Sequence, residues 1–237
     1  ELLVALTEFD ALCGFRPLVE LERLFDLLAA SKDERVAELA THYRALLPGG
    51  IREIFADALG RREDFDWFIE ALGAAALPAE DAELVAQLSA AYPGDPGILV
   101  ALMMQRVRLN PGQAIFVDAG VLHAYLGGLG IEIMSSSDNV LRGGLTPKHI
   151  DVAELVSVVD FEPKDASLAA TTELARGLVR FETPIQDFVL YRAEVSGSNL
   201  LADLNLPSDC VLLCTGGEVT VSTSKGEFET LRLGEAA

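Results

Sequence analysis

The stretch GQAIFVDAGVLHAYLGGLGIEIMSSSDNVLRGGLTPKHID, residues 112–151, carries the pattern that decides the fold of this chain. Its apolar run AIFV at 114–117 is typical of a short buried strand, and the Asp-Ala-Gly that follows predicts a turn. Residues 122–126 can alternate as a second strand. The stretch also combines a histidine, carboxylates, an arginine and a lysine, a mixture that few purely structural segments need. We therefore expect a functional site built on β-strands.

The turn after the second strand predicts the geometry of that site. Because side chains alternate along a strand, His123 and Tyr125 share one face. The pair Gly127-Gly128 suits a two-residue hairpin turn, which needs positive φ. Such a hairpin would place Glu132 directly opposite His123, on the same side of the sheet. The sequence therefore predicts a histidine and a carboxylate that converge.

Around this stretch the chain divides into four parts, which together predict a mainly β protein with a helical domain. Residues 1–17 contain two short apolar runs that suit strands. Residues 18–92 carry apolar residues at helical spacing, and a Pro-Gly cluster at 93–97 ends them. Residues 93–162 hold the site stretch. Residues 163–237 contain further strand patterns, which predict part of a second β domain.

Several local expectations concern the segments outside the site stretch. Residues 98–109 are expected to have β character, and residues 163–182 to form an irregular connection. Further strands are expected at 187–195, 210–213 and 218–222, with Gly216-Gly217 as a hairpin turn.

The composition bounds the class of protein. With 237 residues, of which 50% are hydrophobic, the chain can bury one or two ordinary cores. A formal net charge of −19 argues against nucleic acid and anionic membranes as partners, since both are polyanions. No apolar run reaches the roughly 18 residues that a membrane span needs. The three cysteines form no Cys-x-x-Cys pair, which favours a reducing compartment, and we expect a cytoplasmic protein whose oligomeric state stays undetermined.

Four motifs resemble those of type I phosphomannose isomerases, a family of zinc enzymes built on cupin β-barrels. They are LTEFDALCGFRP at 6–17, AGVLHAYL at 119–126, GIEIM at 130–134 and SDNVLRGGLTPKHID at 137–151, in the family's order. The resemblance runs over most of residues 1–160 and continues more weakly beyond. It implies cupin-type (jelly-roll) β-barrels with an all-α insertion. It also implies that the 237 residues are an internal part of a longer protein.

The resemblance implies one zinc ion per full-length chain. In the family, Glu1 would end an Asn-His-Lys-Pro-Glu motif whose glutamate binds zinc, and His123 matches a histidine ligand. Two further ligands belong to an upstream Gln-x-His pair that this sequence does not contain. A lone strand histidine is more often structural, so the assignment of His123 depends on the predicted position of Glu132 and on the resemblance. His42 and His149 have no such support, and we expect both to be structural.

The activity implied by the resemblance is the interconversion of mannose 6-phosphate and fructose 6-phosphate through a cis-enediol, in the carbohydrate metabolism that serves GDP-mannose biosynthesis. Such a step needs a base, a Lewis acid or cation for the enediolate, and a cationic anchor for the phosphate. Glu132 and Asp138 are both candidates for the base. Arg142 and Lys148 are candidates for catalysis and for substrate binding, and Tyr125 for substrate binding.

Structural roles and other functions remain open for these residues. Glu132 also suits a solvated strand position, Asp138 a turn and Lys148 an exposed surface. Arg142, which precedes two glycines, carries a planar fork that suits phosphate or enediolate oxygens. Two alternative classes are a cupin that only binds a sugar and a metal-dependent cupin oxygenase. An oxygenase usually clusters several histidines in its barrel, whereas the site stretch offers His123 without a His-x-His pair.

Overall fold

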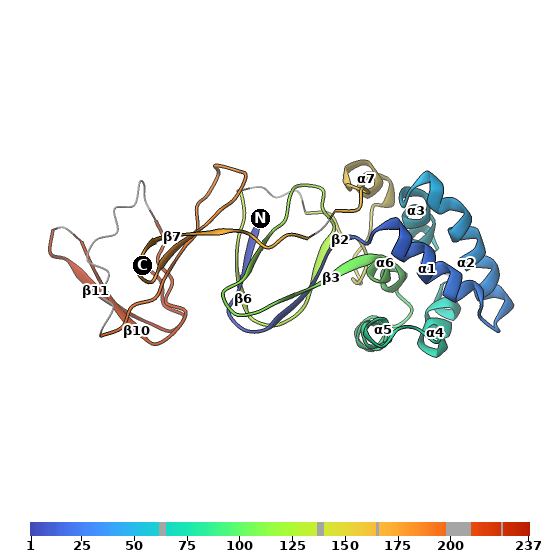
Figure 1. Cartoon of the computed structure of the whole chain (residues 1–237), viewed down its shortest axis with the longest axis horizontal. Coiled ribbons are helices and arrows are strands. Elements are labelled where there is room, and N and C mark those ends of the chain that lie inside the picture. Colours follow the sequence, from blue (N-terminus) through green and yellow to red (C-terminus); the bar gives the residue numbers. More distant parts are fainter. Residues whose placement is uncertain (62–64, 137–139, 165, 198–209, 224) are drawn as a thin grey trace.

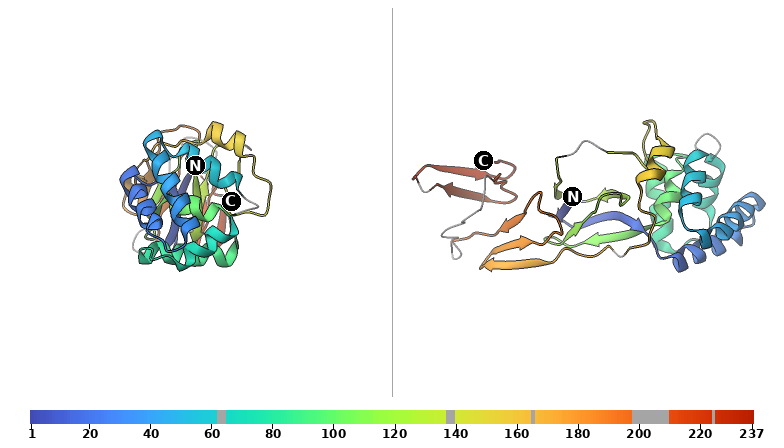
Figure 2. Two further views of the ribbon diagram at one scale, coloured as in Figure 1. Left: turned by 90° about the vertical axis from the view of Figure 1, so that its right-hand side faces the viewer. Right: turned by 90° about the horizontal axis from the view of Figure 1, so that it is seen from above.

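The computed structural model describes all residues except 62–64, 137–139, 165, 198–209 and 224. The described part is elongated, with a layer of helices at one end, β-sheets in the middle and a two-stranded sheet at the other end (Figure 1). The view from above shows the same order along the long axis, and the view from the helical end shows the helices in front (Figure 2). The expectation of β-sheets joined to an all-helical region is therefore confirmed. No described helix is long and apolar enough to cross a membrane.

The helical layer is built from amphipathic helices whose apolar faces meet in one core. Phe25, Tyr43 and Phe55 are fully buried there, and the Tyr43 hydroxyl donates to Asp57 at 2.8 Å. The helices are α1 (Leu18–Ala29), α2 (Glu34–Leu46), the 3₁₀ helix η1 (Leu47–Gly49), α3 (Arg52–Gly60), α4 (Asp66–Ala74), α5 (Ala79–Ala91) and α6 (Gly97–Leu102).

The amino-terminal segment supplies the central strand of two antiparallel sheets. The first sheet has the order β4-β1-β6, with β1 at Leu2–Ala5, β4 at Ala114–Phe116 and β6 at Gly130–Ile133. The second has the order β3-β2-β5, with β2 at Phe9–Phe15, β3 at Met104–Leu109 and β5 at His123–Gly127. Leu3 of the first sheet and Ala11 of the second belong to one buried cluster, so the two sheets pack against each other.

The predicted glycine hairpin is wrong, because β5 and β6 belong to different sheets. His123 lies opposite Cys13 on β2 rather than opposite Glu132. The reason is that the turn between β1 and β2 packs against the turn between β5 and β6. The packing is so tight that a Cβ on Gly128 would lie 2.6 Å from the Glu8 carbonyl oxygen. Both connections therefore cross from one sheet to the other.

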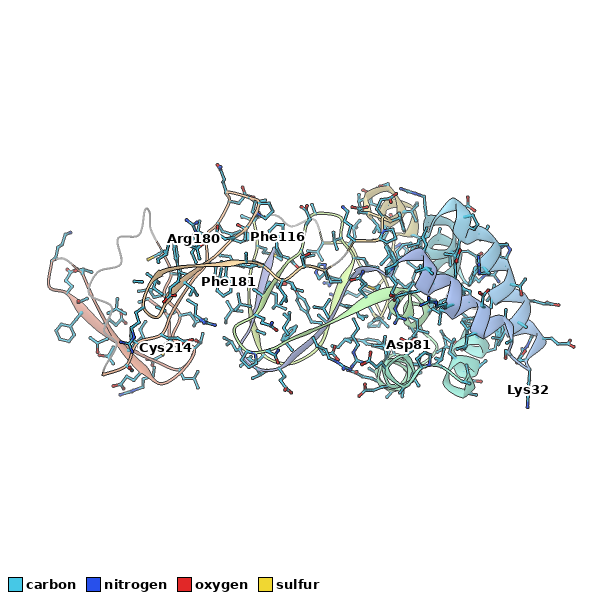
Figure 3. All side chains as sticks on the ribbon, in the orientation of Figure 1. Lys32, Asp81, Phe116, Arg180, Phe181 and Cys214 are labelled. Carbon is cyan, nitrogen blue, oxygen red and sulfur yellow. The ribbon has the colours of Figure 1, made fainter. Side chains whose placement is uncertain are left out.

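The remaining elements extend the molecule toward its carboxyl terminus. They are α7 (Val152–Val158), a third antiparallel sheet of β7 (Thr171–Ala175), β8 (Leu178–Phe181) and β9 (Tyr191–Ala193), and the pair β10 (Glu218–Ser222) and β11 (Phe228–Arg232). Phe116 and Phe181 lie in one apolar cluster where the third sheet meets the first (Figure 3).

Of the expectations about secondary structure, one holds in part near the helical layer and one fails after α7. The β character expected over residues 98–109 is confirmed for Met104–Leu109, which forms β3, but residues 98–102 belong to α6. A short buried apolar run fits either element. Residues 163–182 contain β7 and β8 instead of an irregular connection. The exposed residues of β7 give no alternating pattern that could have predicted the strand.

The strand predictions near the carboxyl terminus hold only in part. The strand expected at 218–222 is confirmed. Of the strand expected at 187–195, only Tyr191–Ala193 forms, and residues 210–213 contribute a single bridge, from Leu213 to Ala236. The hairpin turn at 216–217 is wrong, because β10 pairs with β11, which follows it.

A row of arginine–carboxylate pairs joins the helical layer to the second sheet. Arg16, after β2, donates Nη1 and Nη2 to the two carboxylate oxygens of Asp81 at 3.2 and 2.5 Å, and Nε to the Met104 carbonyl at 2.9 Å. Figure 3 shows Asp81 on α5, where the helices meet the strands. Arg106 and Arg108 of β3 form further pairs with acids of the first turns of α5. The acidic start of α5 is therefore matched to arginines of the β region.

Candidate active site

Facing strands of the two sheets bring four of the predicted site residues together. His123 and Tyr125 share one face of β5, as alternation predicts, while the residues between and beside them pack against the helical core. Glu132 lies on β6 of the other sheet, and Glu1 immediately precedes β1. The Tyr125 hydroxyl lies 2.6 Å from Glu132 Oε1 and 3.1 Å from Glu1 Oε1. The predicted pair of His123 and Glu132 is therefore replaced by a cluster in which His123 contacts Glu1 and Tyr125 contacts Glu132.

The His123 imidazole is held through both ring nitrogens. Nε2 lies 2.7 Å from Glu1 Oε1, and Nδ1 lies 3.0 Å from the Val121 carbonyl oxygen. Because a carbonyl oxygen only accepts, Nδ1 carries the proton of that bond. Nε2 then either donates to Glu1 as part of an imidazolium ion or offers its lone pair to a metal ion. A backbone carbonyl behind the ring is a common way to orient a metal-ligating histidine.

The side chains of this cluster shift one another's pKa values. Burial lowers the pKa of His123, but the hydrogen bonds to Glu1 and Val121 and the nearby carboxylate charges outweigh it, so the net shift is upward. The hydrogen bond from His123 lowers the pKa of Glu1 against the opposing effect of burial. Burial, followed by the hydrogen bond to Glu132, raises the pKa of Tyr125 far above its usual range. Tyr125 therefore stays a neutral hydrogen-bond donor.

The Tyr125 hydroxyl has one proton for two carboxylates. Its shorter contact is with Glu132 Oε1, so the contact with Glu1 lacks a proton whenever Glu132 receives it. The ring is fixed edge-on against Phe9, with 5.4 Å between the centroids. Within the described part of this cluster, the cationic side chain beside these two acids is a protonated His123. The arrangement therefore favours a cation beside Glu1.

Glu1 and His123 fit as two ligands of a zinc ion. Tetrahedral zinc with Zn–N and Zn–O bonds of about 2.0–2.2 Å separates neighbouring ligand atoms by roughly 3.3–3.5 Å. The observed 2.7 Å between His123 Nε2 and Glu1 Oε1 would open by roughly 0.6–0.8 Å to admit the ion, which side-chain rotation can supply. A catalytic zinc usually takes three protein ligands. Among the residues that the structure describes, no group of three or more such side chains could hold a metal.

The predicted residues after β6 belong to the segment that leads from this strand to α7. Asp138 falls outside the described residues. Arg142 and Lys148 lie on an exposed loop, and within the described part Arg142 makes no hydrogen bond or ion pair with the cluster. Gly143 packs so closely on Leu122, the residue before the site histidine, that a Cβ there would lie 2.7 Å from Leu122 Cδ1. The loop therefore passes beside the histidine strand.

Two further observations separate functional candidates from other residues. His42 and His149 are exposed and lie outside the cluster. Sequence reasoning missed Asp95, a buried acid that is hydrogen-bonded to the loop of Arg142 and Lys148. Its signal was an acid inside a Pro-Gly cluster, which was interpreted only as a boundary.

Comparison with curated proteins gives consistent relatives, although no known family model matches this sequence. The chain is 34% identical over 243 residues to the mannose-6-phosphate isomerase of Escherichia coli (strain K12), and 32% identical over 245 residues to the human one. These alignments cover 100% and 94% of this chain, but 60% and 58% of those proteins. The chain therefore spans about three fifths of the length of the curated relatives it matches.

Solved structures of the Salmonella typhimurium isomerase share the fold. One, bound to the substrate fructose 6-phosphate and zinc, has a TM-score of 0.81 at 30% identity and covers 99% of this chain and 59% of that chain. Two others are variants of the same isomerase, one with alanine in place of a histidine, at 30% identity, and one with alanine in place of an arginine, at 29% identity. Both have a TM-score of 0.81, and each covers 99% of this chain and 60% of the other chain. Those two substituted positions lie as far apart in sequence as His123 and Arg142 do here.

Proposed function

Because this chain is related along its whole length to mannose-6-phosphate isomerases, we propose that the full-length protein is an aldose–ketose isomerase that interconverts mannose 6-phosphate and fructose 6-phosphate. The observation that carries the proposal is the convergence of Glu1, His123, Tyr125 and Glu132 from two facing sheets. We propose a sugar phosphate as its small-molecule partner, and neither nucleic acid nor a membrane.

We propose one zinc ion per full-length chain, held by Glu1, His123 and ligands from outside these 237 residues. Bound there, the ion would act as a Lewis acid toward the sugar oxygens. His123 presents the Nε2 lone pair because its Nδ1 proton is committed to the Val121 carbonyl. The Tyr125 hydroxyl donates its one proton at the shorter contact, to Glu132, and so orients that carboxylate beside the ligand Glu1.

Glu132 and Asp138 are both kept as candidates for the base that moves the proton between neighbouring carbons. Glu132 has the structural support: the Tyr125 hydroxyl binds one of its oxygens at 2.6 Å and leaves the other for a substrate proton. Its side chain is also exposed, so a sugar can reach it. A positioned carboxylate of this kind typically contributes about 10²- to 10⁴-fold in rate.

Arg142 and Lys148 are the proposed cations for the reacting sugar phosphate. In a chain with a net charge of −19, an anionic substrate needs local positive charge to overcome the overall field. The Arg142 fork suits enediolate or phosphate oxygens, and Lys148 suits a phosphate as a point charge. The matching separation from His123 in the substituted Salmonella structures supports this assignment. Tyr125 is the proposed third substrate-binding residue.

The organisation of the full-length protein follows from the same proposal. Residues 1–17 and 93–162 would form the catalytic cupin-type (jelly-roll) unit, residues 18–92 its helical insertion, and residues 163–237 part of a second β domain. The three unpaired cysteines support a cytoplasmic location and fit an enzyme of the sugar metabolism that leads to GDP-mannose.

A coupled isomerase assay combined with metal analysis of the full-length protein tests the proposal. Zinc-loaded protein should convert mannose 6-phosphate, lose activity on chelation and regain it with zinc. His123→Ala should lose bound zinc and activity, whereas His149→Ala, at an exposed histidine outside the cluster, should retain both. Unchanged zinc in His123→Ala would contradict the ligand assignment.

The same assay separates the alternative functions. Zinc-loaded wild-type protein that binds the sugar phosphate without turnover would indicate a sugar-binding cupin. Metal-dependent oxygen consumption would indicate an oxygenase. Either result contradicts the isomerase proposal.

A further inference from the structure

The loop between Arg142 and Lys148 touches the start of α6 backbone to backbone. A Cβ on Gly144 would lie 2.7 Å from Gly97 Cα, and a Cβ on Gly97 would lie 2.7 Å from the Leu145 backbone nitrogen. Side chains essentially never approach backbone atoms so closely, so both positions require glycine. The two glycines therefore allow the loop to lie directly on the helical layer.

Asp95 supplies the polar part of the same contact. Its carboxylate is buried, with the residue 9% exposed, and Oδ1 accepts from the Gly97 N–H at 2.8 Å while Oδ2 accepts from the Thr146 N–H at 3.3 Å. One side chain thus joins the first turn of α6 to the loop. An asparagine cannot reproduce this arrangement, because its amide offers one acceptor oxygen and places N–H donors where the second is needed.

The loop backbone also carries local strain. Leu145 has φ 52°, and among the described residues it is the only non-glycine with positive φ. Leucine rarely adopts this conformation, and such residues persist only where their surroundings over-determine them. Here the Gly144 contact lies on one side of Leu145 and the bond between Asp95 and Thr146 on the other. The strained residue falls between two proposed substrate-binding residues.

We propose that Asp95 is a positioning residue that holds the loop in the shape that presents Arg142 and Lys148 to the sugar phosphate. This inference rests on the proposed function. On its other side the loop packs through Gly143 on Leu122, beside the histidine strand. Asp95 does not touch the substrate but acts through the loop backbone, and it couples the helical layer to the site.

The test uses Asp95→Asn and Gly144→Ala in the full-length protein, because the two changes disturb the same contact by different chemistry. Both should lower kcat/KM for mannose 6-phosphate by about 10- to 100-fold, the cost of a displacement of about 1 Å. Bound zinc should stay unchanged, since neither variant touches Glu1 or His123. Amide hydrogen exchange at Thr146 should become faster in both.

Asp81→Asn is the matched control. Asp81 and Asp95 are the two buried charged side chains of the described part, at 8% and 9% exposure, but Asp81 binds Arg16 and not the loop. This control should lower stability and leave kcat/KM at the wild-type value. If Asp81→Asn lowered kcat/KM as much as Asp95→Asn does, the loss in Asp95→Asn would reflect general destabilisation, and the proposal would be overturned.

The remaining outcomes separate this proposal from the proposed function. Wild-type kcat/KM in both loop variants would overturn the positioning role, and so would a loss of zinc together with activity. Faster exchange at Thr146 in a protein whose zinc-loaded wild type shows no isomerase activity would support the contact and contradict the function.

Discussion

Replacing Arg16 by alanine should destabilise the protein more than any loss of an exposed ion pair. Arg16 binds both oxygens of Asp81 and the Met104 carbonyl, and the two side chains are only 14% and 11% exposed. The variant leaves a buried carboxylate without its counter-charge, which typically costs about 3–5 kcal/mol. With a urea slope of about 3 kcal/mol per molar, the unfolding midpoint should fall by roughly 1–1.7 M.

Chemical denaturation followed by circular dichroism measures this change. Arg108→Ala is the control, since Arg108 pairs with Glu80 at 3.0 Å but the side chains are 56% and 67% exposed. It should cost about 1 kcal/mol or less. Removing Asp81 as well should recover part of the Arg16→Ala loss, because no buried charge is then left unpaired. A loss below about 1 kcal/mol in Arg16→Ala, or a double variant as costly as the sum of its parts, would refute the reasoning.

Three further predictions concern the site. Arg142→Lys keeps the charge but loses the planar fork, so kcat and kcat/KM should fall together by about 10²- to 10³-fold in steady-state assays, whereas a raised KM alone would assign Arg142 to phosphate binding. The raised pKa of His123 keeps its proton bound at higher pH, and zinc must displace that proton, so apparent zinc affinity should fall about tenfold per pH unit below that pKa. Competition titrations at several pH values measure this affinity, and an affinity independent of pH would contradict the prediction. Burial, with a smaller effect of the Glu1 charge, raises the pKa of the Cys13 thiol to about 11, so iodoacetamide at about pH 8 should modify exposed Cys210 and spare Cys13, as mass spectrometry can check.

The helical region could be predicted from sequence because its signal is local. Apolar spacing alone predicts helices across residues 18–92, and α5 begins directly after Pro78, a residue that favours helix starts. Residues 98–102 could not be assigned in this way, because a fully buried segment is apolar on every side and loses its period. The helix there depends on its neighbours, which local sequence does not reveal.

The sequence predicted which residues belong to the site, but not the strand pairing that brings them together. Alternation placed His123 and Tyr125 on one face, and the resemblance supplied Glu1. The prediction that Glu132 lies opposite His123 was wrong, because Glu132 pairs with Leu3 of β1. Strand pairing between distant segments overrode the local preference of a glycine pair for a hairpin. The acid inside the Pro-Gly cluster did not reveal the role of Asp95, since that role arises only when the loop reaches α6.

The central position of β1 and β2 has a consequence for how the molecule is made. These strands leave the ribosome before the helical segment and before their partners, which all lie between residues 104 and 133. In the interval the helical segment emerges, and its local contacts favour rapid folding. Once folded, it holds Phe15 and Met104 as neighbours. Because loop-closure entropy grows with the number of free residues, a folded spacer shortens the search of β2 for β3. The topology thus sets an order of assembly during translation, in which the helices form before the sheets close.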